Sequence, residues 1–330
     1  MQTGLPWVEK YRPTSLADLS EQSYVTDTVL KLVDEGQMPH LLFYGPPGTG
    51  KTTTILAIAR HCYGEQVGQM TLELNASDDR GIGVVRDEIQ AFASSQRFFT
   101  SGFKLVVLDE CDNMTKDAQF ALRRIIEKYT RHTRFCLIAN YTSKIIPALQ
   151  SRCMRFRFAP FDSVAAKECV SAVADAEGVP ATEEALSAIV AVSCGDLRRA
   201  CNLLQSCAMS SPLLLDEDMV YMMSGSLKPD EVATLFETLL NDSLSSVVTS
   251  FRTLIEGRGI SLANILPLIS GKVFGLHMNS ASRAIILKAL ADVEVALTQV
   301  SSETSQMRSL VSSFVMLRHG RIHDSAKGCV

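Results

Sequence analysis

The sequence has no uninterrupted apolar run that approaches the roughly 18 residues needed to span a membrane. Its first ten residues also lack the basic flank and apolar stretch that mark a secretory signal. From these two absences we expect a protein that works in the cytosol or the nucleus, with no membrane as a partner.

Patterns for metal binding and disulfide bonding are missing as well. The nine cysteines are an odd number, and no two of them are spaced as a CxxC pair. A small disulfide-stapled fold and a zinc site are therefore both disfavoured. We expect reduced thiols, most of them buried.

An overall excess of basic charge is also absent, because 32 Lys and Arg stand against 36 Asp and Glu, for a net charge of −4. This balance argues against a uniformly basic nucleic-acid binder. The distribution is uneven, however, since residues 123–157 hold nine Arg or Lys and a single acid, Glu127. That segment predicts a local region of positive potential.

The sequence does contain enough apolar material for several packed domains. Hydrophobic residues make up 46% of its 330 residues, and a domain usually takes about 100 to 200 residues. Strand and helix patterns alternate as far as Pro160, after which only helical patterns follow, separated by Gly, Pro and Ser. We predict three domains with boundaries near residues 161 and 226, namely 1–161, 162–225 and 226–330.

The first of these segments carries five short apolar runs that alternate with amphipathic stretches. Such alternation predicts an α/β fold, in which helices cover a parallel five-stranded sheet. The expected strands are His40–Tyr44, Thr71–Asn75, Lys104–Asp109, 134–140 and 154–158.

A phosphate-binding motif of the form G-x-x-x-x-G-K-[ST] follows the first expected strand and opens a helix. Glycines in such a loop let backbone N–H groups surround phosphate oxygens, the lysine reaches the β and γ phosphates, and the hydroxyl ligates magnesium. The motif consists of Gly45, Pro46, Pro47, Gly48, Thr49, Gly50, Lys51 and Thr52.

The third expected strand ends in two acids, Asp109 and Glu110. The C-terminal ends of strands are where α/β sheets bind ligands. We therefore expect Asp109 to hold the magnesium shell and Glu110 to orient or deprotonate the attacking water. The alternative is a solvated strand end, and the phosphate loop in the same chain makes that alternative weaker.

Five further stretches of the sequence are informative. They are residues 7–13 (WVEKYRP), 74–82 (LNASDDRGI), 121–124 (ALRR), 151–153 (SRC) and 195–199 (GDLRR). Together with the phosphate loop they resemble the AAA+ ATPases, and more narrowly the small subunits of the eukaryotic clamp loader, replication factor C. The resemblance is dense over about two thirds of the chain and rests only on helical pattern in the last third.

The resemblance implies an AAA+ P-loop domain, a small helical lid domain and an all-α collar domain that assembles the oligomer. Residues 5–13 and 135–141 are most similar to one particular type of small subunit. One departure is Cys111, where many members have Ala in an Asp-Glu-Ala-Asp sequence. The carboxylates around it are unchanged, so we expect little effect on the chemistry.

The resemblance also assigns nucleotide-site roles that residue patterns alone would not reveal. Asn140 matches a polar sensor of the γ phosphate, and Arg198 matches a second sensor that reaches the phosphates from the lid. Val8 and Arg12 match the segment that wraps the adenine, and Thr53 completes the ATP-binding loop. Without the resemblance, Asn140 would be read as a strand-end amide and Arg198 as a solvated arginine.

Two further assignments concern partners. Arg152, in the sequence Ser-Arg-Cys, matches an arginine finger that acts on the ATP of a neighbouring subunit. By resemblance, Arg80, Arg86 and Lys144 contact the DNA backbone, although a solvated basic surface explains each of them singly about as well.

The function implied is that of an ATPase subunit in a heteropentamer of replication factor C-type chains. With ATP and Mg²⁺ bound, the complex opens a ring-shaped sliding clamp and loads it onto primer-template DNA, in replication and repair in the nucleus. One alternative is an AAA+ protein unfoldase, for which residues 98–102 are the nearest pore-loop candidate but have the wrong order. Another is a scaffold without turnover, and the presence of Lys51, Glu110 and Asn140 counts against it.

Overall fold

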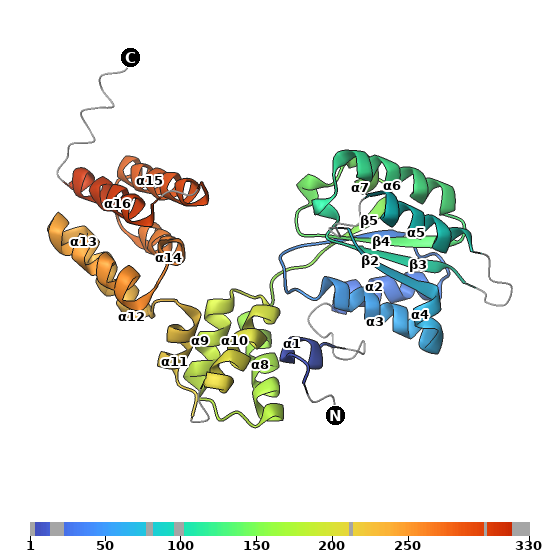
Figure 1. Cartoon of the computed structure of the whole chain (residues 1–330), viewed down its shortest axis with the longest axis horizontal. Coiled ribbons are helices and arrows are strands. Elements are labelled where there is room, and N and C mark those ends of the chain that lie inside the picture. The colour runs from blue at the N-terminus through green and yellow to red at the C-terminus, as the bar shows by residue number, and fades with distance from the viewer. Residues whose placement is uncertain are drawn as a thin grey trace, which may run out of the picture. The chain divides into compact units, whose positions relative to one another are not determined.

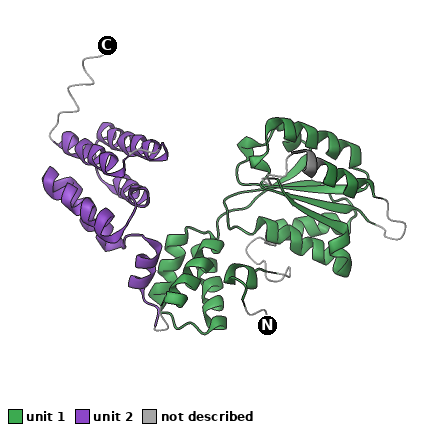
Figure 2. Cartoon of the chain, in the orientation of Figure 1, with its two compact units in different colours: residues 1–212 green, residues 213–330 purple. Residues whose placement is uncertain are grey.

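The computed structural model describes residues 4–13, 23–76, 82–95, 102–210, 214–299 and 302–318. The chain divides into two compact units, residues 1–212 and 213–330 (Figure 2). The first unit holds the sheet and a group of helices that follows it, and the second unit is helical.

A five-stranded parallel sheet forms the centre of the first unit, as the sequence predicts. Its strand order is β2-β3-β4-β1-β5. The central position of β4 brings the C-terminal ends of β1, β3 and β4 to one edge of the sheet, where ligands bind in such folds. The last two strands start one residue earlier than predicted. The strands are β1 (His40–Tyr44), β2 (Thr71–Asn75), β3 (Lys104–Asp109), β4 (Thr133–Ala139) and β5 (Cys153–Arg157).

Helices cover both faces of this sheet (Figure 1). One face packs against α2 (Ser23–Asp34), α3 (Lys51–Tyr63) and α4 (Val67–Met70), and the other against α5 (Ile82–Ser94), α6 (Lys116–Tyr129) and α7 (Pro147–Gln150). Short 3-10 turns are found at Gly64–Gln66, Cys111–Asn113 and Thr142–Lys144.

Alternate side chains of each strand enter the two cores, because successive residues of a strand point to opposite faces. Leu41 and Phe43 of β1 pack with α2 and α3, whereas Leu42 packs in the cluster on the α6 side. All three are fully buried. Burial on both faces explains why the strands read as continuous apolar runs in the sequence.

A group of three helices follows the sheet within the first unit. It consists of α8 (Ser163–Glu177), α9 (Glu183–Ser193) and α10 (Leu197–Ser210), and the short helix α1 (Trp7–Lys10) lies beside α8 and α10 (Figure 1). Gly178 ends α8 with a positive φ of 66°, and the Thr182 hydroxyl caps α9 by accepting from Ala185 N.

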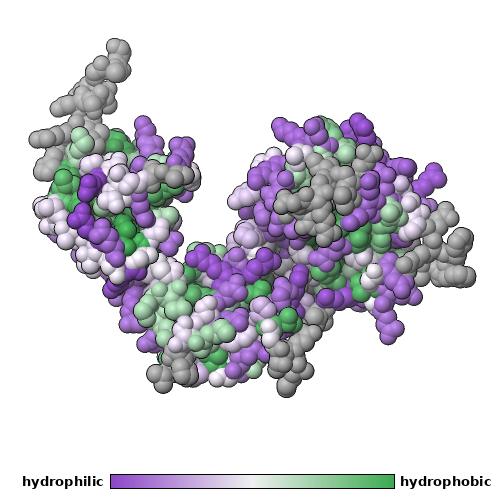
Figure 3. All heavy atoms as spheres, in the orientation of Figure 1, coloured by the Kyte–Doolittle hydropathy of each residue, from purple (hydrophilic) through white to green (hydrophobic). Residues whose placement is uncertain are grey.

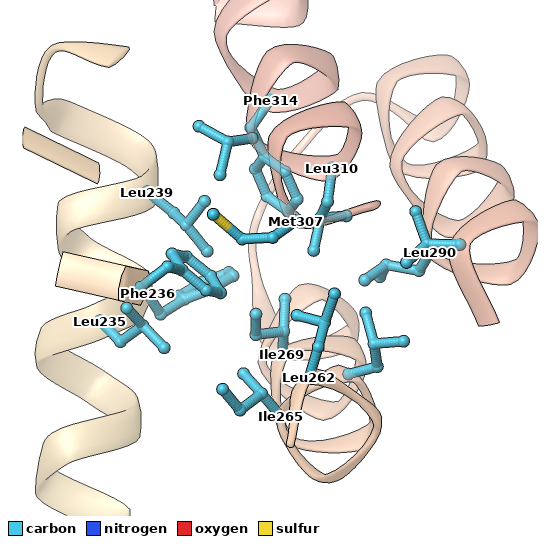
Figure 4. Close-up of a cluster of buried hydrophobic side chains, with 14 of the residues drawn as sticks. Leu235, Phe236, Leu239, Leu262, Ile265, Ile269, Leu290, Met307, Leu310 and Phe314 are labelled. Carbon is cyan, nitrogen blue, oxygen red and sulfur yellow. The ribbon is translucent and has the colours of Figure 1, made fainter. Parts of the chain in front are cut away.

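The second unit is entirely helical in its described part. Side chains from five of its helices, α12 to α16, meet in one hydrophobic core, in which Leu235 and Phe236 of α12 face Ile269 of α14 and Met307 and Phe314 of α16 (Figure 4). Its helices are α11 (Glu217–Ser224), α12 (Pro229–Asn241), α13 (Leu244–Arg252), a π turn at Thr253–Gly257, α14 (Leu262–Gly275), α15 (Ser280–Thr298) and α16 (Glu303–Arg318).

No helix in the described ranges is long and apolar enough to cross a membrane. On the face drawn in Figure 3, hydrophilic residues dominate and hydrophobic ones form scattered groups. Of the eight cysteines in the described ranges, four are buried, two are half-buried and two, Cys169 and Cys194, are exposed, so fewer of them are buried than the sequence analysis expected.

Candidate nucleotide-binding site

The loop between β1 and α3 approaches its neighbours so closely that two of its glycines cannot carry a side chain. A Cβ on Gly45 would lie 2.2 Å from the Phe158 carbonyl oxygen, and one on Gly48 would lie 1.7 Å from Oδ1 of Asp196. Gly45, Gly48 and Gly50 all have positive φ angles, of 150°, 70° and 83°. This conformation leads into the N-terminus of α3, whose unpaired N–H groups favour an anion.

Lys51 is held at the centre of this loop, where only 7% of its surface is exposed. Its Nζ donates to Gly45 O at 2.8 Å, to Pro46 O at 2.6 Å and to Asn140 Oδ1 at 3.2 Å. Burial lowers the pKa of Lys51, and the nearby Asp109 carboxylate opposes that shift. The predicted phosphate lysine and the predicted sensor at the end of β4 are therefore in direct contact.

The two acids at the end of β3 take different partners. Thr52 Oγ1 donates to Asp109 Oδ2 at 2.6 Å, and Asp109 Oδ1 accepts from Glu110 N at 2.8 Å. Glu110 itself has left-handed backbone angles, with φ 55° and ψ 36°, and its Oε2 accepts from Asn113 Nδ2 at 3.1 Å. A left-handed non-glycine residue is strained, and such strain is common at functional sites.

Asp112 supports the site, although the sequence analysis gave it no role. It is buried, and its Oδ1 accepts from Asn140 N at 3.3 Å. This hydrogen bond ties the turn after β3 to the end of β4. The sequence signal was available in the acidic run 109–112, but only the fold brings Asp112 to Asn140.

These groups line a cavity of about 580 Å³ within the first unit. Its lining combines the polar groups of the phosphate loop with apolar residues, among them Val8, Pro13, Phe161, Val173 and Leu197. Such a division suits a ligand with a charged and an apolar end. The predicted site residues in its lining are Val8, Arg12, Pro47, Gly48, Thr49, Gly50, Lys51, Thr52, Thr53, Asp109, Glu110, Asn140 and Arg198.

Asp196 places the start of α10 against the phosphate loop, and this contact was missed from the sequence. Its Oδ1 accepts from the backbone N–H groups of Arg198 and Arg199, at 2.9 and 3.1 Å. This is the N-terminal cap that Asp favours at the start of a helix. The same carboxylate abuts Gly48, so the cap brings Arg198 to the cavity.

Arg152, the predicted finger, is bonded away from this cavity. Its guanidinium pairs with Glu127 and donates from Nη1 to Ala148 O at 2.8 Å. Glu127 also accepts from Arg123 Nε at 3.1 Å, and this hydrogen bond is the main cause of its lowered pKa. The cavity lining, as far as the chain is described, does not include Arg152.

The predicted DNA contacts are only partly covered by the structure. Lys144 is exposed at the end of the turn Thr142–Lys144, with its Nζ 5.3 Å from the centroid of the Tyr141 ring. Arg80 lies outside the described residues. Arg86 lies in α5, but its side chain is outside the described ones.

Three family models match successive parts of the chain. Residues 41–161 match the ATPase family associated with various cellular activities (AAA). Residues 168–209 match the RCF1/5-like AAA+ ATPase lid domain, and residues 227–313 match the replication factor C C-terminal domain.

Curated relatives cover nearly the whole chain. Replication factor C subunit 3 of Blastobotrys adeninivorans is 46% identical over 94% of this chain and 92% of its own length. Subunit 5 of Homo sapiens is 45% identical, over 96% and 93%. Subunit 3 of Saccharomyces cerevisiae is 43% identical, over 94% and 93%. The subunit type that residues 5–13 and 135–141 indicate is subunit 3 in fungal and subunit 5 in animal numbering, and these relatives confirm it.

Among solved structures, a variant of RuvB from Thermotoga maritima matches with a TM-score of 0.51 at 19% identity, over 76% of this chain and 88% of that one. At this identity the match supports the fold alone. The curated relatives, at 43–46% identity over almost the full length, settle the family. The chain belongs to replication factor C, the family of clamp-loader subunits, and its first unit carries an AAA ATPase domain.

Proposed function

We propose that this chain binds ATP with Mg²⁺ in the cavity of its first unit and hydrolyses it within a heteropentamer that loads a sliding clamp onto primer-template DNA. One observation carries the proposal. The lysine of the phosphate loop contacts Asn140 at 3.2 Å while the adjacent Thr52 contacts Asp109 at 2.6 Å. Side chains from α3, β3 and β4 thus meet at the edge of the sheet where phosphates would lie.

Each residue of the site would have a role in ATP binding or hydrolysis that suits its chemistry. Backbone N–H groups of the phosphate loop and the Lys51 ammonium bind the phosphates and orient them. Glu110, the strained residue after the β3 strand, orients the attacking water and accepts its proton. Asn140 contacts Lys51 and is placed to report on the terminal phosphate. Arg198 adds positive charge from α10.

The donor set at Thr52 and Asp109 fits a magnesium ion. A hydroxyl and a carboxylate are hard oxygen ligands, and their 2.6 Å contact brings both to one point. Magnesium takes few protein ligands when nucleotide phosphates supply the others. The described residues contain no cluster of three or more His, Cys, Asp or Glu that could hold a metal by themselves. When bound, the ion would neutralise charge that develops on the phosphates.

Family membership and the position of Arg152 both support assembly with related subunits. A finger whose guanidinium lies outside its own cavity is suited to a neighbour's ATP, and this supports assembly with related subunits. We assign the C-terminal segment 226–330 to that assembly, and we keep the domain boundaries at 161 and 226 as a prediction. A clamp loader of this family acts on chromosomal DNA, so we place the chain in the nucleus.

Lys51→Ala should weaken ATP binding by at least about 100-fold, because the phosphates lose the buried cation that faces them. Isothermal titration of ATP into the full chain measures this. Lys31→Ala is a matched control, since Lys31 is exposed on α2. An unchanged ATP affinity in Lys51→Ala would remove the phosphate loop from the proposal.

Replacing Arg80, Arg86 and Lys144 together with Ala should flatten the salt dependence of DNA binding by the whole complex. Each phosphate contact that is lost lowers the slope of log K against log salt by about one. Lys288→Ala, an exposed lysine on α15, should leave the slope unchanged. If the triple variant keeps both slope and affinity, these residues are ordinary surface cations.

Two other measurements, ATP hydrolysis by the assembled complex and co-purification, address the two alternatives. A scaffold without turnover would bind ATP and fail to hydrolyse it in the assembled complex. An unfoldase would need a pore loop, and most of its nearest candidate, residues 98–101, lies outside the described residues. Co-purification of a sliding clamp and related AAA+ chains from native extract separates the clamp loader from both.

A further inference from the structure

The N-terminal segment 7–12 is attached on both sides of the nucleotide cavity. On one side the backbone N–H of Trp7 donates to Gln205 Oε1 on α10 at 3.1 Å. On the other side Arg12 Nε donates to Thr53 Oγ1 on α3 at 3.3 Å. Between these two attachments, Val8 and Tyr11 line the cavity. The segment therefore bridges the lid helices and the phosphate-loop helix.

Glu177 holds the same segment through two hydrogen bonds to successive residues. It is the last residue of α8, and its Oε1 accepts from Lys10 Nζ at 2.6 Å and from Tyr11 OH at 2.8 Å. Only 17% of its side chain is exposed. The hydrogen bonds from Lys10 and Tyr11 lower the pKa of Glu177, and the bond to Glu177 raises the pKa of Lys10. The carboxylate is therefore charged at neutral pH and bonded to two successive residues of the segment.

The position of Glu177 on its helix links it to the cavity. Cys169 and Val173 line the cavity from α8, and Glu177 follows at the same four-residue spacing, so all three share one face of the helix. On α10 the same holds for Cys201, which lines the cavity, and Gln205, which holds Trp7. Both α8 and α10 thus present one face that lines the cavity and, one turn later, holds segment 7–12. In Figure 1, α1 of this segment lies beside these two helices.

We infer that Glu177 is a positioning residue that fastens segment 7–12 against the nucleotide cavity and thereby sets how fast bound nucleotide leaves. The inference rests on the proposed nucleotide site. In the described part of the chain, the residues that line the cavity do not include Glu177. It acts through Tyr11 and, one turn earlier, through Val8, which do line it. Release of the base requires the segment to lift, and lifting breaks two bonds to a carboxylate.

The test of this inference measures, by stopped flow, how fast ADP with a fluorescent ribose label dissociates from the full chain. Glu177→Ala should speed dissociation about tenfold, the loss expected when charge-assisted hydrogen bonds are removed. Glu177→Gln, which keeps a neutral acceptor, should fall between Glu177→Ala and wild type. Lys10→Met removes the ion pair from the other side and should speed dissociation in the same direction.

The matched control is Glu183→Ala. Glu183 is a lid glutamate that pairs with Lys167 at 2.8 Å, and both of these residues lie on lid helices. Its removal should change the dissociation rate by less than about twofold, because it breaks a surface ion pair within the lid. A tenfold change in Glu183→Ala would show that any loss of lid charge has this effect, and would overturn the inference.

Inorganic tripolyphosphate separates positioning from general loss of structure. It has no base, so its own binding constant should be unchanged in Glu177→Ala, when it is obtained by competition with labelled ADP and corrected for each variant's affinity for that probe. Equal weakening of both ligands would show a merely structural role and overturn the inference, as would a wild-type rate in both Glu177→Ala and Lys10→Met. Failure of wild-type chain to bind labelled ADP would instead contradict the proposed nucleotide site.

Discussion

Glu110→Gln should leave ATP binding intact and lower hydrolysis at this chain's own site by about 10² to 10⁴, the usual contribution of a general base. The amide has the shape of the carboxylate and can still accept from Asn113, whose Nδ2 lies 3.1 Å from Glu110 Oε2. It cannot accept a proton from water. Binding and turnover should therefore separate in this variant.

The measurement is a single-turnover assay on the reconstituted complex, with labelled ATP bound at this chain's site and ATP affinity determined in parallel. Asp117→Asn provides the control, because Asp117 is an exposed acid in the first turn of α6. Turnover at the wild-type rate in Glu110→Gln would assign the base to another group. Loss of ATP affinity would instead make Glu110 part of the binding site.

The sheet and the order of the site residues could be predicted because they depend on local pattern. Apolar runs that are buried on both faces stand out against amphipathic helices, and His40–Tyr44 and Lys104–Asp109 have the bounds expected. The phosphate loop has a fixed spacing that few other structures require. These features needed no knowledge of which elements meet in space.

The contacts between distant segments could not be predicted in this way. Glu177 and Lys10 are 167 positions apart, and nothing in the composition around Glu177 distinguishes it from other exposed helical acids. Asp196 could have been recognised as a helix cap, but its contact with Gly48 depends on the packing of α10 onto the loop. Such residues are found only when the chain is folded.

Arg152 differs from Glu177 and Asp196, because the resemblance already assigned it a role as an arginine finger. Its contacts in the structure indicate how it could fill that role. Glu127 on α6 and the Ala148 carbonyl in α7 hold its guanidinium. The helices α6 and α7 cover the same face of the sheet. About one-third of the Arg152 side chain is exposed. An arginine held in this way remains partly accessible and lies outside the described lining of this chain's own cavity.

In the reconstituted complex, Arg152→Ala should reduce hydrolysis at the neighbouring subunit's site by about 10³ to 10⁵, the contribution of an arginine finger. This chain's own ATP affinity should be unchanged, because the cavity lining in the described ranges does not include Arg152. Single-turnover hydrolysis at each site, with clamp loading measured alongside, separates the two effects.

Arg123→Ala is the matched control for this variant, because Arg123 pairs with the same Glu127 carboxylate at 3.1 Å but is not the predicted finger. If Arg152 only pairs with Glu127, both variants should behave like wild type, since exposed ion pairs contribute little. Loss of ATP binding at this chain's own site, with undiminished hydrolysis at the neighbour, would reverse the assignment. A large loss of hydrolysis, confined to Arg152→Ala and to the neighbour's site, is explained by a guanidinium that acts in trans on the charge developing on the phosphates. A charge lost elsewhere on the surface would not have this effect, because salt screens exposed charges at long range.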